Sequence, residues 1–114
     1  MGVAPDLDLR FDGILVGRIR NVLRSDGTWF GIYERAIQPD DGELARRLID
    51  YIRFCEDWNE RERHGTADAG EFDAYADVVT SGLWATTDSA DRSTLIADAP
   101  VFFKGNEVTW SSAE

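Results

Sequence analysis

The sequence predicts a single α+β domain spanning residues 1–114, in which helices cover one face of a mostly antiparallel sheet. Strand-like segments cluster at both ends of the chain, and a long amphipathic helix lies between them. The length of 114 residues fits one domain. A hydrophobic content of 43%, with four Trp and six Phe, supplies the core that such a domain needs.

The first third of the chain predicts a three-stranded meander. Residues 7–11, LDLRF, alternate apolar and polar side chains as a half-buried strand does. Asp12-Gly13 and Asp26-Gly27 are strong hairpin signals, because both positions of such a turn need a positive φ. Between them the apolar phase of ILVGRIRNVL shifts at Gly17, which predicts a β-bulge. The third strand is TWFGIYERAI.

Residues 41–64 predict the long helix. Asp40 is expected to cap it with Glu43 completing a capping box, and Gly65 is expected to end it. At about 100° per residue, one apolar stripe contains Leu44, Leu48, Tyr51, Ile52, Cys55 and Trp58. The opposite face contains Arg46, Asp50, Arg53, Asp57, Glu60 and Arg61. Ion pairs four residues apart are expected at Glu43–Arg47, Arg46–Asp50, Arg53–Asp57 and Asp57–Arg61.

The C-terminal half predicts a shorter helix followed by antiparallel strands. Residues 70–81 have helical spacing, although Val78-Val79-Thr80 also suits a strand. LWATT is a predicted strand, and TLIADAPVFF is another, with Pro100 at an edge or bulge. Gly105-Asn106 joins the latter to EVTWSS as a terminal hairpin.

The first hairpin is apolar on both faces. Phe11, Ile14 and Val16 lie on one side, while Leu15 lies on the other. An antiparallel sheet needs only one apolar face in water. The second face is therefore expected to be covered by the C-terminal strands, by a partner, or by a ligand.

The charge of the chain favours a basic protein partner and argues against nucleic acid. The net charge is −10, and residues 65–114 carry nine acids against Arg92 and Lys104. Such a surface repels phosphates and attracts basic proteins. The candidate partner-binding residues are Asp73, Asp77, Asp88 and Asp91.

The aromatic residues raise a second possibility, a ligand pocket between sheet and helices. In TWFGIYE, Trp29 and Tyr33 share one face, whereas Phe30 and Ile32 share the other. Most such aromatics belong to a core or its rim. If a pocket exists, its candidate residues are Trp29, Tyr33, Trp84 and Trp110.

No catalytic residue, metal site or cofactor site is assigned from the sequence. Cys55 lies on the apolar stripe and is expected to be an inert core thiol. Cys55 and His64, nine residues apart on one helix, point in opposite directions and cannot form a catalytic dyad. No apolar run approaches the ~20 residues that span a bilayer. A cytoplasmic protein without a membrane partner is therefore expected.

Three functions remain open at this stage. The first is a non-enzymatic interaction module that binds a basic partner, as inhibitor- and immunity-type proteins do. The second is a small-molecule-binding or enzymatic domain with an aromatic pocket. The third is a structural homodimer without chemistry, so both a monomer and a homodimer are considered.

Overall fold

Two Asp-Gly turns fold the N-terminal third into the predicted meander. The computed structural model describes residues 6–112, in which β1 spans Leu7–Phe11, β2 Ile14–Ser25 and β3 Thr28–Arg35. Both turns have positive φ at both positions, 50° and 81° at Asp12-Gly13 and 51° and 82° at Asp26-Gly27. Leu9 pairs with Gly17 and Arg10 with Leu15, so β2 carries one extra residue there. The bulge predicted at Gly17 is confirmed.

Four C-terminal strands extend this meander into a seven-stranded antiparallel sheet. They are β4 (Trp84–Thr87), β5 (Ser93–Leu95), β6 (Val101–Phe102) and β7 (Glu107–Ser111), and the sheet order is β5-β4-β1-β2-β3-β7-β6. The segment TLIADAPVFF, predicted as one strand, forms β5 and β6 on opposite sides of the meander. Pro100 lies between them, where its missing N–H costs no ladder hydrogen bond.

The sheet curls until its two sides meet. Ile96 forms an antiparallel bridge with Ser112, and its backbone N–H donates to the carbonyl of Trp84 at 3.0 Å. The N–H of Ala97 donates to the carbonyl of Ser111 at 2.9 Å. The segment that follows β5 therefore joins β4 to the end of β7 and closes the sheet on itself at this level.

The C-terminal strands do not cover the second apolar face of the meander. They lie beside it in the same sheet, and the outer face keeps exposed apolar side chains at Leu15, Leu23, Phe30 and Ile32. A partner and a ligand are the two remaining candidates to cover this outer face.

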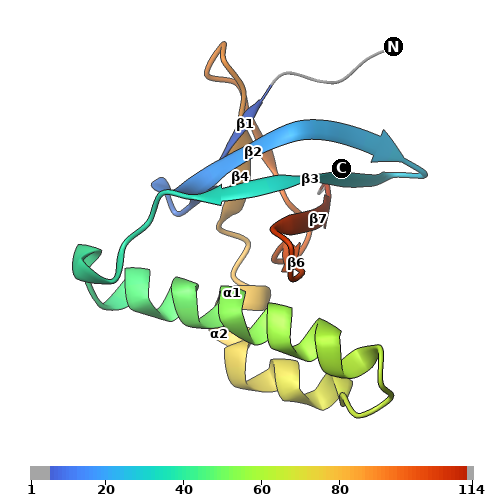
Figure 1. Cartoon of the computed structure of the whole chain (residues 1–114). Coiled ribbons are helices and arrows are strands. Elements are labelled where there is room, and N and C mark those ends of the chain that lie inside the picture. The colour runs from blue at the N-terminus through green and yellow to red at the C-terminus, as the bar shows by residue number, and fades with distance from the viewer. Residues whose placement is uncertain (1–5, 113–114) are drawn as a thin grey trace.

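Helix α1 (Glu43–Glu62) runs along one face of the sheet (Figure 1). It begins at Glu43 behind Gly42, and the capping box predicted for Asp40 and Glu43 is wrong. The box is formed one turn earlier, around the 3₁₀ turn η1 (Pro39–Asp41), where the Asp41 carboxylate accepts the Gln38 N–H at 2.9 Å. Gly42, with φ of 120°, separates this turn from the helix.

The buried stripe of α1 is shifted from the predicted one. Leu48, Tyr51, Ile52 and Cys55 are buried as predicted, but Leu44 is 37% exposed and Trp58 is half-buried. Ala45 and Ile49 take their places. Leu44 lies in the first turn of the helix. Trp58 lies at the edge of the buried stripe, where its indole N–H donates to the carbonyl of Asp68.

The outer face of α1 forms only one of its four predicted ion pairs within residues 6–112. Arg61 pairs with Asp57 at 2.9 Å. Arg47 pairs instead with Asp77 at 2.7 Å, and Arg61 also forms a two-bond fork with Glu71. Both contacts tie α1 to the segment that follows it. Arg47 thus pairs with an acid across the fold in place of Glu43, whereas Arg46 donates to the carbonyl of Pro39.

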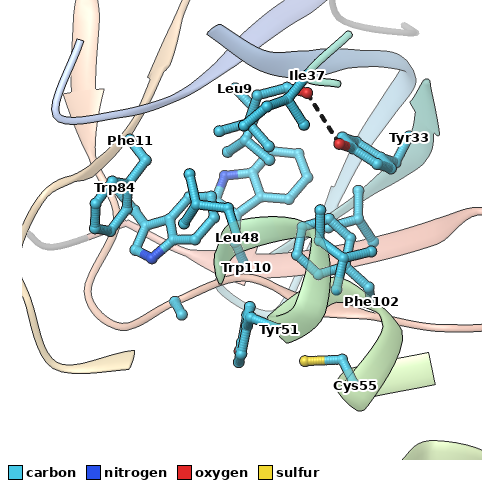
Figure 2. Packing of buried hydrophobic residues seen from close by; sticks show 14 of the residues in the cluster. Leu9, Phe11, Tyr33, Ile37, Leu48, Tyr51, Cys55, Trp84, Phe102 and Trp110 are labelled. Carbon is cyan, nitrogen blue, oxygen red and sulfur yellow. Dashed lines mark hydrogen bonds between the residues drawn. The ribbon is translucent and has the colours of Figure 1, made fainter. Parts of the chain in front are cut away.

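Residues 69–79 are helical, as predicted, but mostly as a 3₁₀ helix. They form η2 (Ala69–Tyr75) and one turn of α helix, α2 (Ala76–Val79). The core lies between α1 and the inner face of the sheet, where Tyr51 contacts the rings of Trp84 and Phe102 (Figure 2). Within residues 6–112, no helix is both long and apolar enough to cross a membrane.

Candidate functional site

The inner surface of the curled sheet contains a pocket of about 250 Å³. Helix α1 fills the neighbouring part of this surface and contributes none of the pocket's lining residues. Six lining residues come from strands or their ends and two from the loop between β4 and β5. They are Leu7, Trp29, Thr86, Thr94, Trp110 and Ser112, with Asp88 and Arg92 from the loop.

Strand alternation explains why these side chains converge. Leu7 lies two residues from buried Leu9, Thr86 two residues from buried Trp84, and Trp110 two residues from buried Val108. Each therefore continues an inward-facing row to the end of the core, where Trp110 is itself a core residue. The pocket is the end of the core that neither helix nor side chain fills.

Two stacked indoles form one wall of the pocket. Trp29 of β3 and Trp110 of β7 are directly opposite in the sheet, with ring centroids 6.2 Å apart and ring planes 10° apart. The Trp29 indole N–H donates to Ser112 Oγ at 3.1 Å. The guanidinium of Arg24 lies 5.2 Å from the centroid of Trp29, a cation–π contact. These contacts fix the orientation of the Trp29 ring.

Asp88 holds the loop that overhangs the pocket. Its Oδ1 accepts the backbone N–H groups of Ala90 and Arg92 at 2.9 and 3.0 Å. Its Oδ2 accepts Nε of Arg92 at 3.1 Å. These hydrogen bonds, led by the backbone N–H of Arg92, lower the pKa of Asp88. Asp88 is therefore ionised at neutral pH, with both oxygens engaged in the loop.

The indole N–H of Trp110 has no hydrogen-bond partner within residues 6–112. The side chain is only 6% exposed. In the same part of the chain, no side-chain nitrogen or oxygen that is sealed from solvent lacks a partner. Trp110 is one of the residues that line the pocket.

The structure divides the four predicted aromatic residues into two pairs. Trp29 and Trp110 lie together in the pocket, whereas Tyr33 and Trp84 lie outside it. The Tyr33 hydroxyl donates to the carbonyl of Val16 at 3.0 Å, and burial raises the pKa of Tyr33. Trp84 is 1% exposed and donates to the carbonyl of Val78 at 3.0 Å. Both have their polar atoms satisfied inside the fold.

The four predicted partner-binding acids are distributed over two regions. Asp73 and Asp77 belong to the helical segment that follows α1, and Asp88 and Asp91 belong to the β4–β5 loop. Asp77 is paired with Arg47, and Asp88 is engaged as described above. Asp73 and Asp91 are exposed, without an ion pair inside residues 6–112.

Sequence reasoning missed six pocket residues, of which Asp88 had been predicted only as a partner-binding acid: Leu7, Thr86, Asp88, Arg92, Thr94 and Ser112. Thr86 and Ser112 each lie two positions from a predicted aromatic residue, so alternation alone would have placed them on the same face. Thr94 and Arg92 depend on the pairing of β4 with β5, in which Thr86 is opposite Thr94. No pattern within the β5 segment indicates that pairing.

Cys55 lies outside the pocket and is fully buried. Burial raises its pKa to about 11, so the thiol is protonated at neutral pH and poorly nucleophilic. The prediction of a core thiol is confirmed. Comparison of the whole chain with protein-family models, curated proteins and solved structures gives no match to any of them.

Proposed function

We propose that this protein binds a small, flat organic molecule in the pocket at the mouth of the curled sheet. The observation that carries the proposal is the wall of two nearly parallel indoles, Trp29 and Trp110, inside a cavity of about 250 Å³. Ligand sites favour the mouths of barrels, and they combine an apolar lining with a few polar groups. Thr86, Thr94 and the loop residue Arg92 supply such polar groups.

The pocket is built from rigid elements, which favours binding. Its lining comes mainly from hydrogen-bonded strands, and the orientation of Trp29 is set by Ser112 and Arg24. A ligand entering such a site loses less free energy to the ordering of side chains than one that must organise a loop.

A second groove, of about 230 Å³, is a weaker candidate. It lies between the C-terminal end of α1 and strands β3 and β7, and it includes Phe30 and Phe103. Its other lining residues include four long charged side chains, Glu60, Arg63, Lys104 and Glu107. These long side chains lie at the surface, where only Glu60 and Arg63 pair with each other, so the groove is less rigid than a pocket lined by strands.

Blocking each cavity separately tests the proposal. Thr94→Phe places a ring in the inner pocket, and Thr109→Phe places one in the second groove beside Phe30. Indole is a suitable neutral probe, with an expected Kd of about 1 mM or tighter. Calorimetric titration should show that Thr94→Phe weakens binding at least about tenfold, whereas Thr109→Phe leaves it within about twofold. Loss of binding only in Thr109→Phe would place the binding site in the second groove instead.

The net charge of −7 over residues 65–114 supports a second candidate function, the binding of a basic protein. Asp73 and Asp91 are the acids best suited to it, because Asp77 and Asp88 stabilise the fold. The test is an on-rate measured against salt with any partner recovered by affinity capture. Asp73→Lys combined with Asp91→Asn, which suits the φ of 60° at position 91, should slow association several-fold while the melting temperature is retained. An on-rate that changes with neither salt nor these substitutions would rule out this candidate function.

A further inference from the structure

The free polar groups of the inner pocket are mostly hydrogen-bond donors. The Trp110 N–H has no partner within residues 6–112, as shown above. The Thr86 and Thr94 hydroxyls can donate or accept. The only carboxylate in the lining, Asp88, already accepts two backbone N–H groups and one guanidinium N–H. A ligand that satisfies this pocket therefore needs an acceptor.

The positive charge of Arg92 indicates that the acceptor of the ligand is an anion. Asp88 binds Arg92 through Nε, and the two terminal guanidinium nitrogens of Arg92 have no hydrogen-bond partner inside residues 6–112. The Arg92 side chain is 81% exposed, so its guanidinium lies at the rim of the pocket with its terminal N–H groups in solvent. These N–H groups form a fork that matches the two oxygens of a carboxylate.

We propose that the ligand is a small aromatic carboxylate, whose ring packs on Trp29 and Trp110 and whose carboxylate is bound by Arg92 and the Trp110 N–H. This inference rests on the proposed function and names the ligand class for the same pocket. Ring and carboxylate are both needed, since the indole wall favours a flat apolar body and the free donors favour an anionic end.

A cationic ligand fits the pocket less well, even though the chain is acidic overall. Aromatic walls do bind cations, but Arg24 lies 5.2 Å from the centroid of Trp29 and places a positive charge beside the pocket. Arg92 and Arg24 place two positive charges at the pocket against the one negative charge of Asp88, whose oxygens already accept hydrogen bonds. The charges around the pocket therefore favour an anionic ligand, whereas the net charge of the chain would favour a cationic one.

Three probes of one shape separate the possibilities: indole-3-acetate, the neutral indole-3-acetamide, and the cation tryptamine. Each is titrated into the full chain at pH 7 by calorimetry. We expect the acetate to bind about three- to tenfold more tightly than the acetamide, because the ion pair lies at an exposed rim. We expect tryptamine to bind most weakly. The preference for the acetate should shrink as salt is added.

Two matched variants assign the preference to Arg92. Arg92→Met retains the backbone N–H that Asp88 binds, so the loop is kept. It should remove the preference for the acetate and leave acetamide binding within about twofold. Arg63→Met is the control, because Arg63 is similarly exposed and pairs with Glu60 outside this pocket. It should leave all three affinities unchanged.

The outcomes distinguish this inference from the function on which it rests. Equal binding of acetate and acetamide, or tightest binding of tryptamine, would overturn the carboxylate assignment and leave ligand binding intact. A preference for acetate that survives in Arg92→Met would also overturn it. Failure of all three probes to bind at millimolar concentration would overturn both proposals.

Discussion

Gly17 determines how closely β2 approaches the aromatic core. It lies at the bulge of β2, where a Cβ atom would overlap the Tyr33 ring and the backbone carbonyl of Glu34. The Tyr33 hydroxyl bonds to the neighbouring carbonyl of Val16, which holds the ring over this glycine. The sequence indicated Gly17 only through a shift of the apolar phase, and the ring that requires it became visible in the structure.

We therefore expect Gly17→Ala to destabilise the protein by about 2 kcal/mol or more, since neither the backbone carbonyl nor the buried ring can move freely. Gly70→Ala is the matched control, because a Cβ there meets only ordinary contacts with Asp68 and needs no unusual φ. Urea unfolding should show a change below about 1 kcal/mol for the control. Equal effects at the two sites would contradict the close packing at Gly17.

Burial of Cys55 makes the stability of the fold decrease as the pH rises in the alkaline range. Burial raises its pKa from 9.0 to about 11 in the folded protein. Above pH 9 the unfolded chain loses the thiol proton while the folded protein retains it, so stability falls as pH rises. Burial also raises the pKa of Tyr51, which acts in the same direction.

Cys55 should therefore contribute a fall of roughly 1–2 kcal/mol in the free energy of unfolding between pH 9 and 10.5, and the buried Tyr33 and Tyr51 should add to it. Urea unfolding at several pH values measures this slope. Cys55→Ala, although less stable throughout, should have a shallower slope because it lacks the thiol. The same slope in both proteins, or stability that rises with pH, would contradict the burial of a protonated thiol.

At the scale of elements, helix α1 offers a comparison between two leucines of one helix. Leu48 is fully buried, whereas Leu44, one turn earlier, is 37% exposed. Leu48→Ala should cost about 2–5 kcal/mol because it leaves a cavity in the core. Leu44→Ala should cost less than about 1 kcal/mol, since its surroundings include solvent. Urea unfolding compares them directly, and similar losses would restore the stripe that the sequence predicted.

The elements that could be predicted are those with local causes. The two Asp-Gly turns, the three strands they connect and the position of α1 depend on neighbours in the sequence. The helix start was misplaced because Gln38 and Asp41 form a competing box around a 3₁₀ turn. The ion pairs of Arg47 and Arg61 depend on acids far along the chain, at Asp77 and Glu71, which periodicity cannot indicate.

At the scale of the whole molecule, closure of the sheet creates the pocket. The bridge between Ile96 and Ser112 brings the β4–β5 hairpin opposite Trp29 and Trp110. The sequence indicated the two tryptophans as candidates. The segment that forms β5 and β6 was predicted as one strand, however, so this closure was not predicted. The pocket therefore depends on a long-range pairing that no local pattern predicts, although two of the four aromatic candidates, Trp29 and Trp110, line it.

The indole N–H groups of the four tryptophans give the most direct test of the ligand site. Trp58 and Trp84 donate to the carbonyls of Asp68 and Val78, away from the pocket. Trp29 and Trp110 line the pocket itself. Each indole N–H gives its own peak in a ¹H–¹⁵N spectrum, assigned by single Trp→Phe variants. Titration with indole should shift the Trp29 and Trp110 peaks along one saturating curve and leave the other two in place. Shifts at Trp58 or Trp84 alone, or no saturable shift at Trp29 and Trp110, would contradict a ligand site at the mouth of the sheet.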